Sequence, residues 1–89
     1  ATHAGDIVAQ AQSTYEAILL VLKEAGAGPS DLVNTIEYVV PEGLKEYRGV
    51  AGVRENLLSK PWPSSTGALC HSLLRPEFMI EVFPLAVLS

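Results

Sequence analysis

The sequence contains a single cysteine, two histidines and no long uninterrupted apolar run. One cysteine cannot form an internal disulfide, which suits a reducing compartment, and we therefore expect a cytoplasmic protein. Glutamate, lysine and proline interrupt every apolar stretch before it reaches the roughly 18 residues of a membrane span, so no membrane contact is expected. The first residues also lack the charged-then-apolar pattern of a secretory leader.

Basic residues are few and scattered, and the formal net charge is −4. A protein that binds nucleic acid would show a basic stripe, so the charge argues against that class of partner. The histidines, His3 and His71, lie far apart in sequence, and no cluster of metal ligands surrounds either. We expect neither a metal nor a cofactor.

The composition is 48% hydrophobic and 18% charged over 89 residues, a length that predicts one domain covering residues 1–89. A chain this short buries only about 60–65% of the surface that its unfolded form exposes. It therefore carries more apolar side chains than its own core is expected to hold. The excess predicts a second buried surface, against copies of the chain or a partner.

Hydrophobic periodicity predicts helix, strand, helix, strand, strand along the chain. Helices are expected over residues 6–24, capped by Asp6 and stopped at Gly26, and over residues 42–60, where three glycines weaken the second helix. Strands are expected over residues 32–40, 66–73 and 78–87, with the last two joined by a short turn around Arg75 and Pro76.

This order predicts an α+β fold in which both helices cover one face of a small mixed sheet. The opposite face would be bare and would carry part of the apolar excess. We expect the contact between subunits on that face.

The adjacent pair Cys70 and His71 is the most obvious candidate for chemistry, and the strand geometry excludes it. Neighbouring residues on a strand point to opposite faces, so the two side chains cannot share a proton. A thiol nucleophile and its base need to be within hydrogen-bond reach. Cys70 is instead predicted to be a small buried residue.

Glu81 lies in FMIEVFPL, the most apolar stretch of the chain. A carboxylate there either faces solvent from a half-exposed strand or lies at the rim of a cleft, where it can hold and polarise a water molecule. Periodicity alone leaves both interpretations open.

A short polar run lies where the connection enters the expected strand 66–73 and consists of Ser64, Ser65, Thr66 and Gly67. Hydroxyls and backbone N–H groups in such a run can bind a small anion, although the same residues also make ordinary turns. The nearby Trp62, between two prolines, either lines a pocket or fills an interface, and we favour the interface.

Several phrases of the chain, in order, resemble the Rid family of reactive intermediate deaminases, also called YjgF-type proteins. They are Gly5-Asp6, Ala9-Gln10, Glu24-Ala25-Gly26 and Asp31-Leu32-Val33-Asn34-Thr35, followed by the closing run LLRPEFMIEVFPLAV. Together they cover nearly the whole chain.

The resemblance implies a fold like that of small chorismate mutases, assembled as a homotrimer with clefts between subunits. It also implies hydrolysis of small enamines and imines, such as 2-aminoacrylate, to a keto acid and ammonia. Glu81 matches the family glutamate that positions the attacking water. An arginine in a Pro-Ala-Arg-Ser/Thr phrase holds the substrate carboxylate in active members, because a guanidinium is a planar bidentate donor.

The sequence departs from the family pattern in two places. The arginine phrase is Pro63-Ser64-Ser65-Thr66, so any carboxylate would be held by Ser64, Ser65, Thr66 and Gly67, with Arg75 lending charge. Only four residues precede Gly5, where family members carry a strand hairpin, and we expect that hairpin to be lacking. The sequence therefore predicts a trimeric imine or enamine deaminase or a divergent relative, or else a non-catalytic ligand-binding or assembly subunit on the same scaffold.

Overall fold

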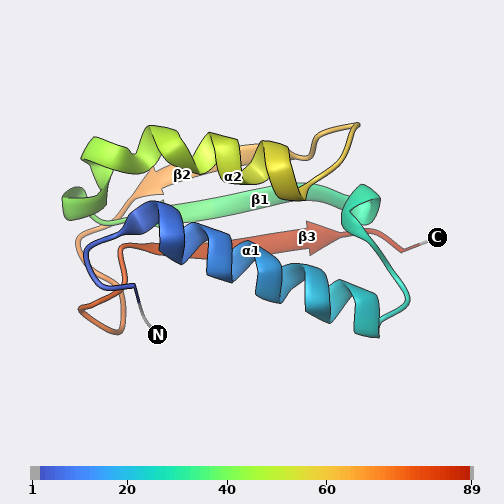
Figure 1. The fold of residues 1–89 in the computed structure, drawn as a ribbon, viewed down its shortest axis with the longest axis horizontal. Coiled ribbons are helices and arrows are strands. Elements are labelled where there is room, and N and C mark those ends of the chain that lie inside the picture. Colours follow the sequence, from blue (N-terminus) through green and yellow to red (C-terminus); the bar gives the residue numbers. More distant parts are fainter. Residues whose placement is uncertain (1–2, 89) are drawn as a thin grey trace.

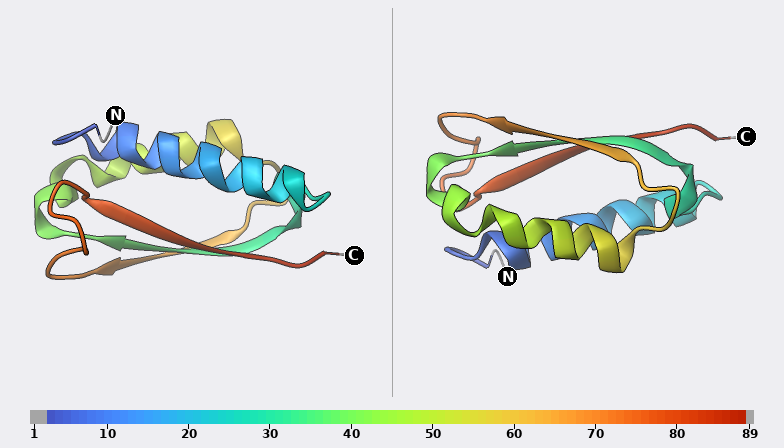
Figure 2. Two further views of the ribbon diagram at one scale, coloured as in Figure 1. Left: turned by 90° about the horizontal axis from the view of Figure 1, so that it is seen from below. Right: turned by 90° about the horizontal axis from the view of Figure 1, so that it is seen from above.

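The computed structural model describes residues 3–88, which form two helices and a three-stranded sheet (Figure 1). Helices α1 and α2 lie on the same side of the sheet and leave its other face open (Figure 2). This confirms the predicted α+β architecture. The elements in chain order are α1 (Ile7–Glu24), η1 (Pro29–Asp31), β1 (Leu32–Val39), η2 (Pro41–Gly49), α2 (Val50–Leu57), β2 (Ser64–Leu69) and β3 (Ile80–Ala86).

Helix α1 begins and ends where its capping residues predict. The Asp6 carboxylate accepts a hydrogen bond from the backbone N–H of Ala9 at 3.0 Å, which satisfies one of the free donors of the first turn. At the other end Gly26 has a φ of 76°, and the N–H of Ala27 donates to the carbonyl of Leu22 at 2.8 Å. This six-to-one bond after a left-handed glycine is the usual end of a helix.

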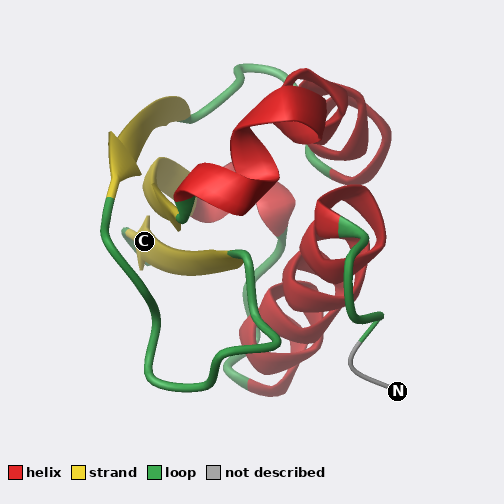
Figure 3. Ribbon diagram, turned by 90° about the vertical axis from the view of Figure 1, so that its left-hand side faces the viewer, coloured by secondary structure: helices red, strands yellow, loops and turns green. Residues whose placement is uncertain are grey.

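Strand β1 is the central strand of the sheet, whose order is β2-β1-β3. It pairs in parallel with β2 and antiparallel with β3. The expected short turn between the last two strands is therefore wrong, because β2 and β3 lie on opposite sides of β1 and do not pair with each other. Residues 70–79 connect them past the end of β1 (Figure 3).

The second expected helix is divided into a 3₁₀ segment, η2, and the shorter α2. Two of its glycines allow the segment to approach α1 closely. A Cβ atom on Gly43 would come within 2.7 Å of the Ile7 side chain, and one on Gly49 within 2.8 Å of Val8. The glycines that weaken a regular helix here are the residues that let the two helical segments pack.

Strand β2 is shorter than predicted and ends at Leu69 instead of residue 73. The N–H of Cys70 still donates to the carbonyl of Val39 at 3.0 Å. Beyond that bond the partner strand has ended, because Pro41 starts η2, and residues 71–73 pair with no strand in the described part of the chain.

The core lies between the sheet and the two helices and includes Tyr15 of α1, Val39 of β1, Val50 of α2 and Ile80 of β3. The open face of the sheet carries exposed apolar side chains. Tyr38 and Phe83 contact each other there edge to face, with their ring centroids 5.6 Å apart. Among residues 3–88 there is no helix whose length and apolar character would allow it to cross a membrane.

Candidate functional site

A fully buried carboxylate, Glu37, lies at the centre of β1 on the face that the helices cover. Three side chains donate to it. The hydroxyl of Tyr15 in α1 makes a short hydrogen bond to Oε2, the hydroxyl of Tyr47 in η2 donates to Oε1 at 2.6 Å, and Arg54 Nη1 reaches both oxygens at 2.8 and 2.7 Å. We call these four residues the Glu37 cluster.

The Glu37 cluster is held together by mutually reinforcing charges and hydrogen bonds. Burial raises the pKa of both tyrosines, and their hydrogen bonds to Glu37 raise it further, to about 12 for Tyr47. Burial by itself lowers the pKa of Arg54, but the hydrogen bond and the charge of Glu37 outweigh it, so the net shift is upward. The carboxylate is surrounded by donors and closed to solvent, so it links α1, β1, η2 and α2 and is not placed to activate a water molecule.

The polar run of β2 divides between the two faces of the sheet. Ser65 lies on the helix side, where its hydroxyl oxygen is 3.1 Å from Thr35 Oγ1 and therefore close to the Glu37 cluster. Gly67 lies on the same side, because a Cβ there would come within 2.6 Å of the Tyr47 hydroxyl. Ser64 bonds to Asn34 Oδ1 at 2.8 Å, and Thr66 pairs with Ile36, both on the open face.

Glu81 is exposed on the open face of β3, where it pairs with Tyr38. Thr66 lies on the same face, two strands across and two residues along, at a distance of about 12 Å by ordinary sheet spacing. Glu81 and the polar run therefore do not meet within one subunit. A site that used both groups would need a second surface to close the gap.

Arg75 lies in the connection between β2 and β3 and is largely exposed. Its Nη2 atom is 2.7 Å from Oε2 of Glu77, and its guanidinium lies 5.3 Å above the centre of the Phe78 ring. The pKa of Glu77 is lowered by a hydrogen bond from its own backbone and by Arg75, while desolvation opposes both. Arg75 is thus already bound by Glu77 and Phe78 of its own loop.

Cys70 is partly buried just beyond β2, and His71 beside it is exposed. Within residues 3–88 no three histidine, cysteine, aspartate or glutamate side chains gather closely enough to hold a metal ion.

The Glu37 cluster is the feature that the sequence analysis missed. A signal was present, because Glu37 interrupts the β-rich run TIEYVV as Glu81 interrupts FMIEVFPL. The cost of burying a charge applies to both residues, but only Glu81 was singled out. Its partners could not be found from spacing, since Tyr15, Tyr47 and Arg54 come from three other segments.

No family model and no curated protein sequence matches this chain. Solved structures do match it. A member of the YjgF/YER057c/UK114 family from Mycobacterium tuberculosis shares 27% sequence identity at a TM-score of 0.81, over 93% of this chain and 70% of the other. The Rid family protein YyfB from Yersinia pestis shares 28% identity at a TM-score of 0.74, over 96% of this chain and 65% of the other.

RidA from an Antarctic Psychrobacter has the same fold, with a TM-score of 0.79, 22% identity, and coverage of 92% of this chain and 65% of the other. The chain thus spans about two thirds of the length of these neighbours. Three observations point to the same family: the shared fold, the 27% and 28% identity to the M. tuberculosis and Y. pestis proteins, and the ordered phrases of the sequence. The chain has the YjgF-like fold of these proteins and is similar to Rid family members in sequence as well as in structure.

Proposed function

We propose that this chain is an imine or enamine deaminase of the Rid type, or a divergent relative, with its site between subunits of a homotrimer. The observation that carries the proposal is Glu81, which lies exposed on the open face of β3. In the Rid family that the sequence resembles, the glutamate that positions the attacking water lies on the last strand, which is β3 here. Within residues 3–88 no cation lies within salt-bridge distance of its carboxylate, so it is free to accept a proton.

The proposed reaction needs only water and a base. Glu81 accepts a proton from water as the water oxygen bonds to the imine carbon. Glu81 passes this proton to the imine nitrogen, which gives a carbinolamine. The hydroxyl proton of the carbinolamine then moves through Glu81 to the amino group as the carbon–nitrogen bond breaks, so ammonia leaves and the hydroxyl oxygen becomes the keto oxygen. An enamine enters the same route once a proton has moved from its nitrogen to its terminal carbon. The apolar side chains around Glu81, including Tyr38 and Phe83, provide a surface on which a second subunit can exclude bulk water.

The alternative is a non-catalytic ligand-binding or assembly subunit, and one observation favours it. The polar run contains no arginine, and the hydroxyls of Ser64 and Ser65 are already engaged with Asn34 and Thr35. Neutral donors hold a carboxylate less well, because charge-assisted hydrogen bonds are about twice as strong as neutral ones. We therefore expect weak turnover of small imino acids by the unmodified chain.

The test is release of ammonia and pyruvate from 2-aminoacrylate generated enzymatically in the assay. Glu81→Gln should abolish the activity, because an amide cannot accept the proton from water. Ser65→Arg or Ser64→Arg should increase it by restoring a bidentate clamp. Activity that survives Glu81→Gln would contradict the assigned base. Intact assemblies that gain nothing from either arginine would support the binding subunit.

A further inference from the structure

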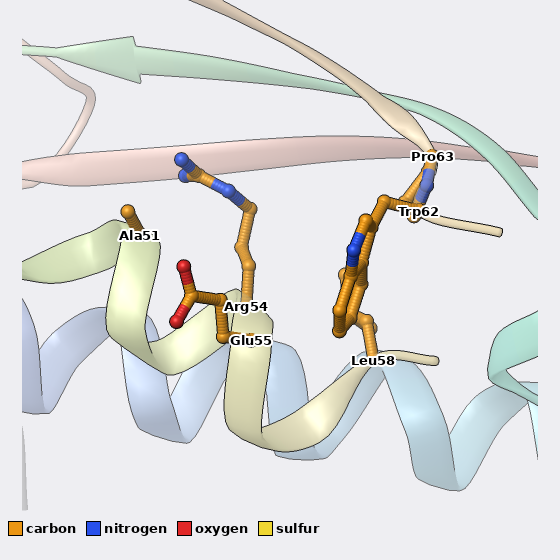
Figure 4. Close-up of a pocket in the computed structure, with 6 residues that line it drawn as sticks. All are labelled: Ala51, Arg54, Glu55, Leu58, Trp62 and Pro63. Atoms are coloured by element: carbon orange, nitrogen blue, oxygen red, sulfur yellow. The ribbon is translucent and has the colours of Figure 1, made fainter. Parts of the chain in front are cut away.

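A small groove runs along α2 on the helix side of the molecule, away from the face that carries Glu81. One wall is a helical stripe, and the other is the segment before β2 (Figure 4). The stripe follows the three- and four-residue spacing of a helix, and the groove encloses about 170 Å³. The residues that line it are Ala51, Arg54, Glu55, Leu58, Trp62 and Pro63.

Arg54 brings unused hydrogen-bond donors to the groove. Within residues 3–88 both hydrogen bonds of Arg54 to Glu37 come from Nη1, so Nε and Nη2 make no contact with that carboxylate. Among the same residues no buried side-chain nitrogen or oxygen lacks a partner. The Arg54 side chain is 23% exposed and lines the groove, where Nε and Nη2 are the donors that Glu37 leaves unused. They present the N–H groups that a carboxylate accepts most readily.

Glu55 and Trp62 bring the complementary groups. Glu55 is exposed, and its carboxylate makes no ion pair within the described part of the chain. Trp62 is 47% exposed and turns the flat face of its indole along the groove (Figure 4). The groove thus offers a guanidinium, a carboxylate and an aromatic surface within one small volume.

The charge balance decides which ligand fits. Glu37 already neutralises the charge of Arg54 from the core side. A simple anion in the groove would therefore meet one guanidinium and two carboxylates, those of Glu37 and Glu55. A simple cation would leave the free Arg54 donors unpaired. A molecule with both charges satisfies both groups. At about 170 Å³ the groove has room for a ligand of the size of a small amino acid.

We propose that this groove binds a small zwitterion, an α-amino acid with an apolar side chain. Its carboxylate accepts from Nε and Nη2 of Arg54, its ammonium donates to Glu55, and its side chain packs on the Trp62 ring. The proposal does not depend on deamination, since none of these residues lies near Glu81.

Trp62 is the only tryptophan of the chain, so its fluorescence reports on the groove directly. The probes are L-valine and two analogues of the same shape: 3-methylbutanoate, which lacks the ammonium, and isobutylamine, which lacks the carboxylate. We expect a saturable fluorescence change with L-valine, and at least tenfold weaker binding of each analogue, because each loses one charge-assisted contact.

Glu55→Gln should weaken L-valine binding about tenfold and leave 3-methylbutanoate unchanged or slightly tighter, since the glutamate is exposed and its loss does not disturb the core. Glu46→Gln, an exposed glutamate of η2, is the matched control and should change neither. Arg54→Lys should weaken L-valine and 3-methylbutanoate alike, with a thermal melt to verify folding.

Two results would overturn the proposal. One is the absence of a saturable response to L-valine in the folded protein. The other is equal binding of L-valine and 3-methylbutanoate with no effect of Glu55→Gln, which would describe a simple anion site. Because the measurement contains no deamination step, neither result bears on the proposed enzyme activity.

Discussion

Glu37 shows how one residue can depend on many others. Its carboxylate is fully buried, and two tyrosines and an arginine from separate helical segments donate to it. A buried charge is tolerated only when its partners are all present, because each partner offsets part of the desolvation cost. The cluster is therefore sensitive to any single change.

Replacing Glu37 with glutamine should lower the free energy of unfolding by about 3 kcal/mol, because Arg54 would keep a partly buried charge without a counter-ion. Urea unfolding followed by circular dichroism measures the change. Glu46→Gln, on the exposed side of η2, is the control and should stay within about 0.5 kcal/mol of the parent. A similarly small effect of Glu37→Gln would show that the ion pair contributes little.

The raised pKa of Tyr47 predicts a loss of stability in alkali. A tyrosine has a pKa of about 10 in the unfolded chain. In the folded protein the pKa of Tyr47 is raised to about 12, so the folded state holds the proton more tightly. The corresponding stability is fully present below pH 10 and is lost as the pH rises towards 12. Tyr15 acts in the same direction.

Thermal melts between pH 8 and pH 12 test this expectation. Tyr47→Phe should flatten the alkaline loss, whereas Tyr38→Phe on the open face should leave its slope unchanged. Parallel curves for all three proteins would mean that ionisation of Tyr47 is not linked to unfolding.

At the level of elements, local signals predicted most of the fold. Helix α1 combines a regular apolar stripe, an aspartate cap and a glycine stop, and both of its ends were placed correctly. Strand β1 alternates clearly, but its more polar side, with Thr35 and Glu37, faces the helices, while Tyr38 is exposed. Hydrogen bonds from residues distant in sequence offset the cost of burying these polar side chains. The periodicity of a single strand contains no information about such partners.

The connections between elements were predicted less well, for a related reason. The order of β2 and β3 around β1 depends on long-range pairing, which residue spacing does not encode. The same holds for the candidate site residues, because contacts between distant segments cannot be read from spacing. Glu81 was identified from its own surroundings, whereas Arg54 becomes notable only beside Glu37.

Packing between β2 and η2 predicts a specific coupling. Gly67→Ala should destabilise the protein by about 1–3 kcal/mol, since the new methyl group would come within 2.6 Å of the Tyr47 hydroxyl. Adding Tyr47→Phe removes that oxygen, so the double variant should lose less than the sum of the two single changes. Urea midpoints of the four proteins complete the cycle, and strict additivity would rule out the contact.

At the scale of the whole molecule, the open face of the sheet is the surface with most to gain from a partner. It exposes Tyr38, Phe83 and Leu85, and no helix formed by residues 3–88 covers it (Figure 2). Apolar side chains gathered on one face are typical of a surface that is buried in an assembly. The proposed trimer would place this face and Glu81 at the contact between subunits.

Phe83→Lys should convert the proposed trimer to a monomer of 9.5 kDa, because a lysine in that contact would be desolvated without a partner. Light scattering after gel filtration measures the mass, which should be three times larger for the parent chain. Glu24→Lys, at the exposed end of α1, is a charge control that should keep the parent mass. A parent chain that is already monomeric would end the trimer proposal.

The central position of β1 also has a kinetic consequence. Its two neighbours come later in the chain, and its pairing with β3 joins residues as distant in sequence as Leu32 and Ala86. Contacts between residues so far apart in sequence slow folding, because the intervening chain must close into a loop, at a cost in entropy, before the pairing of the strands stabilises anything. During synthesis the sheet therefore stays incomplete until β3 has left the ribosome, and a nascent chain stalled before Ile80 would leave the edge of β1 that pairs with β3 open to chaperones and proteases.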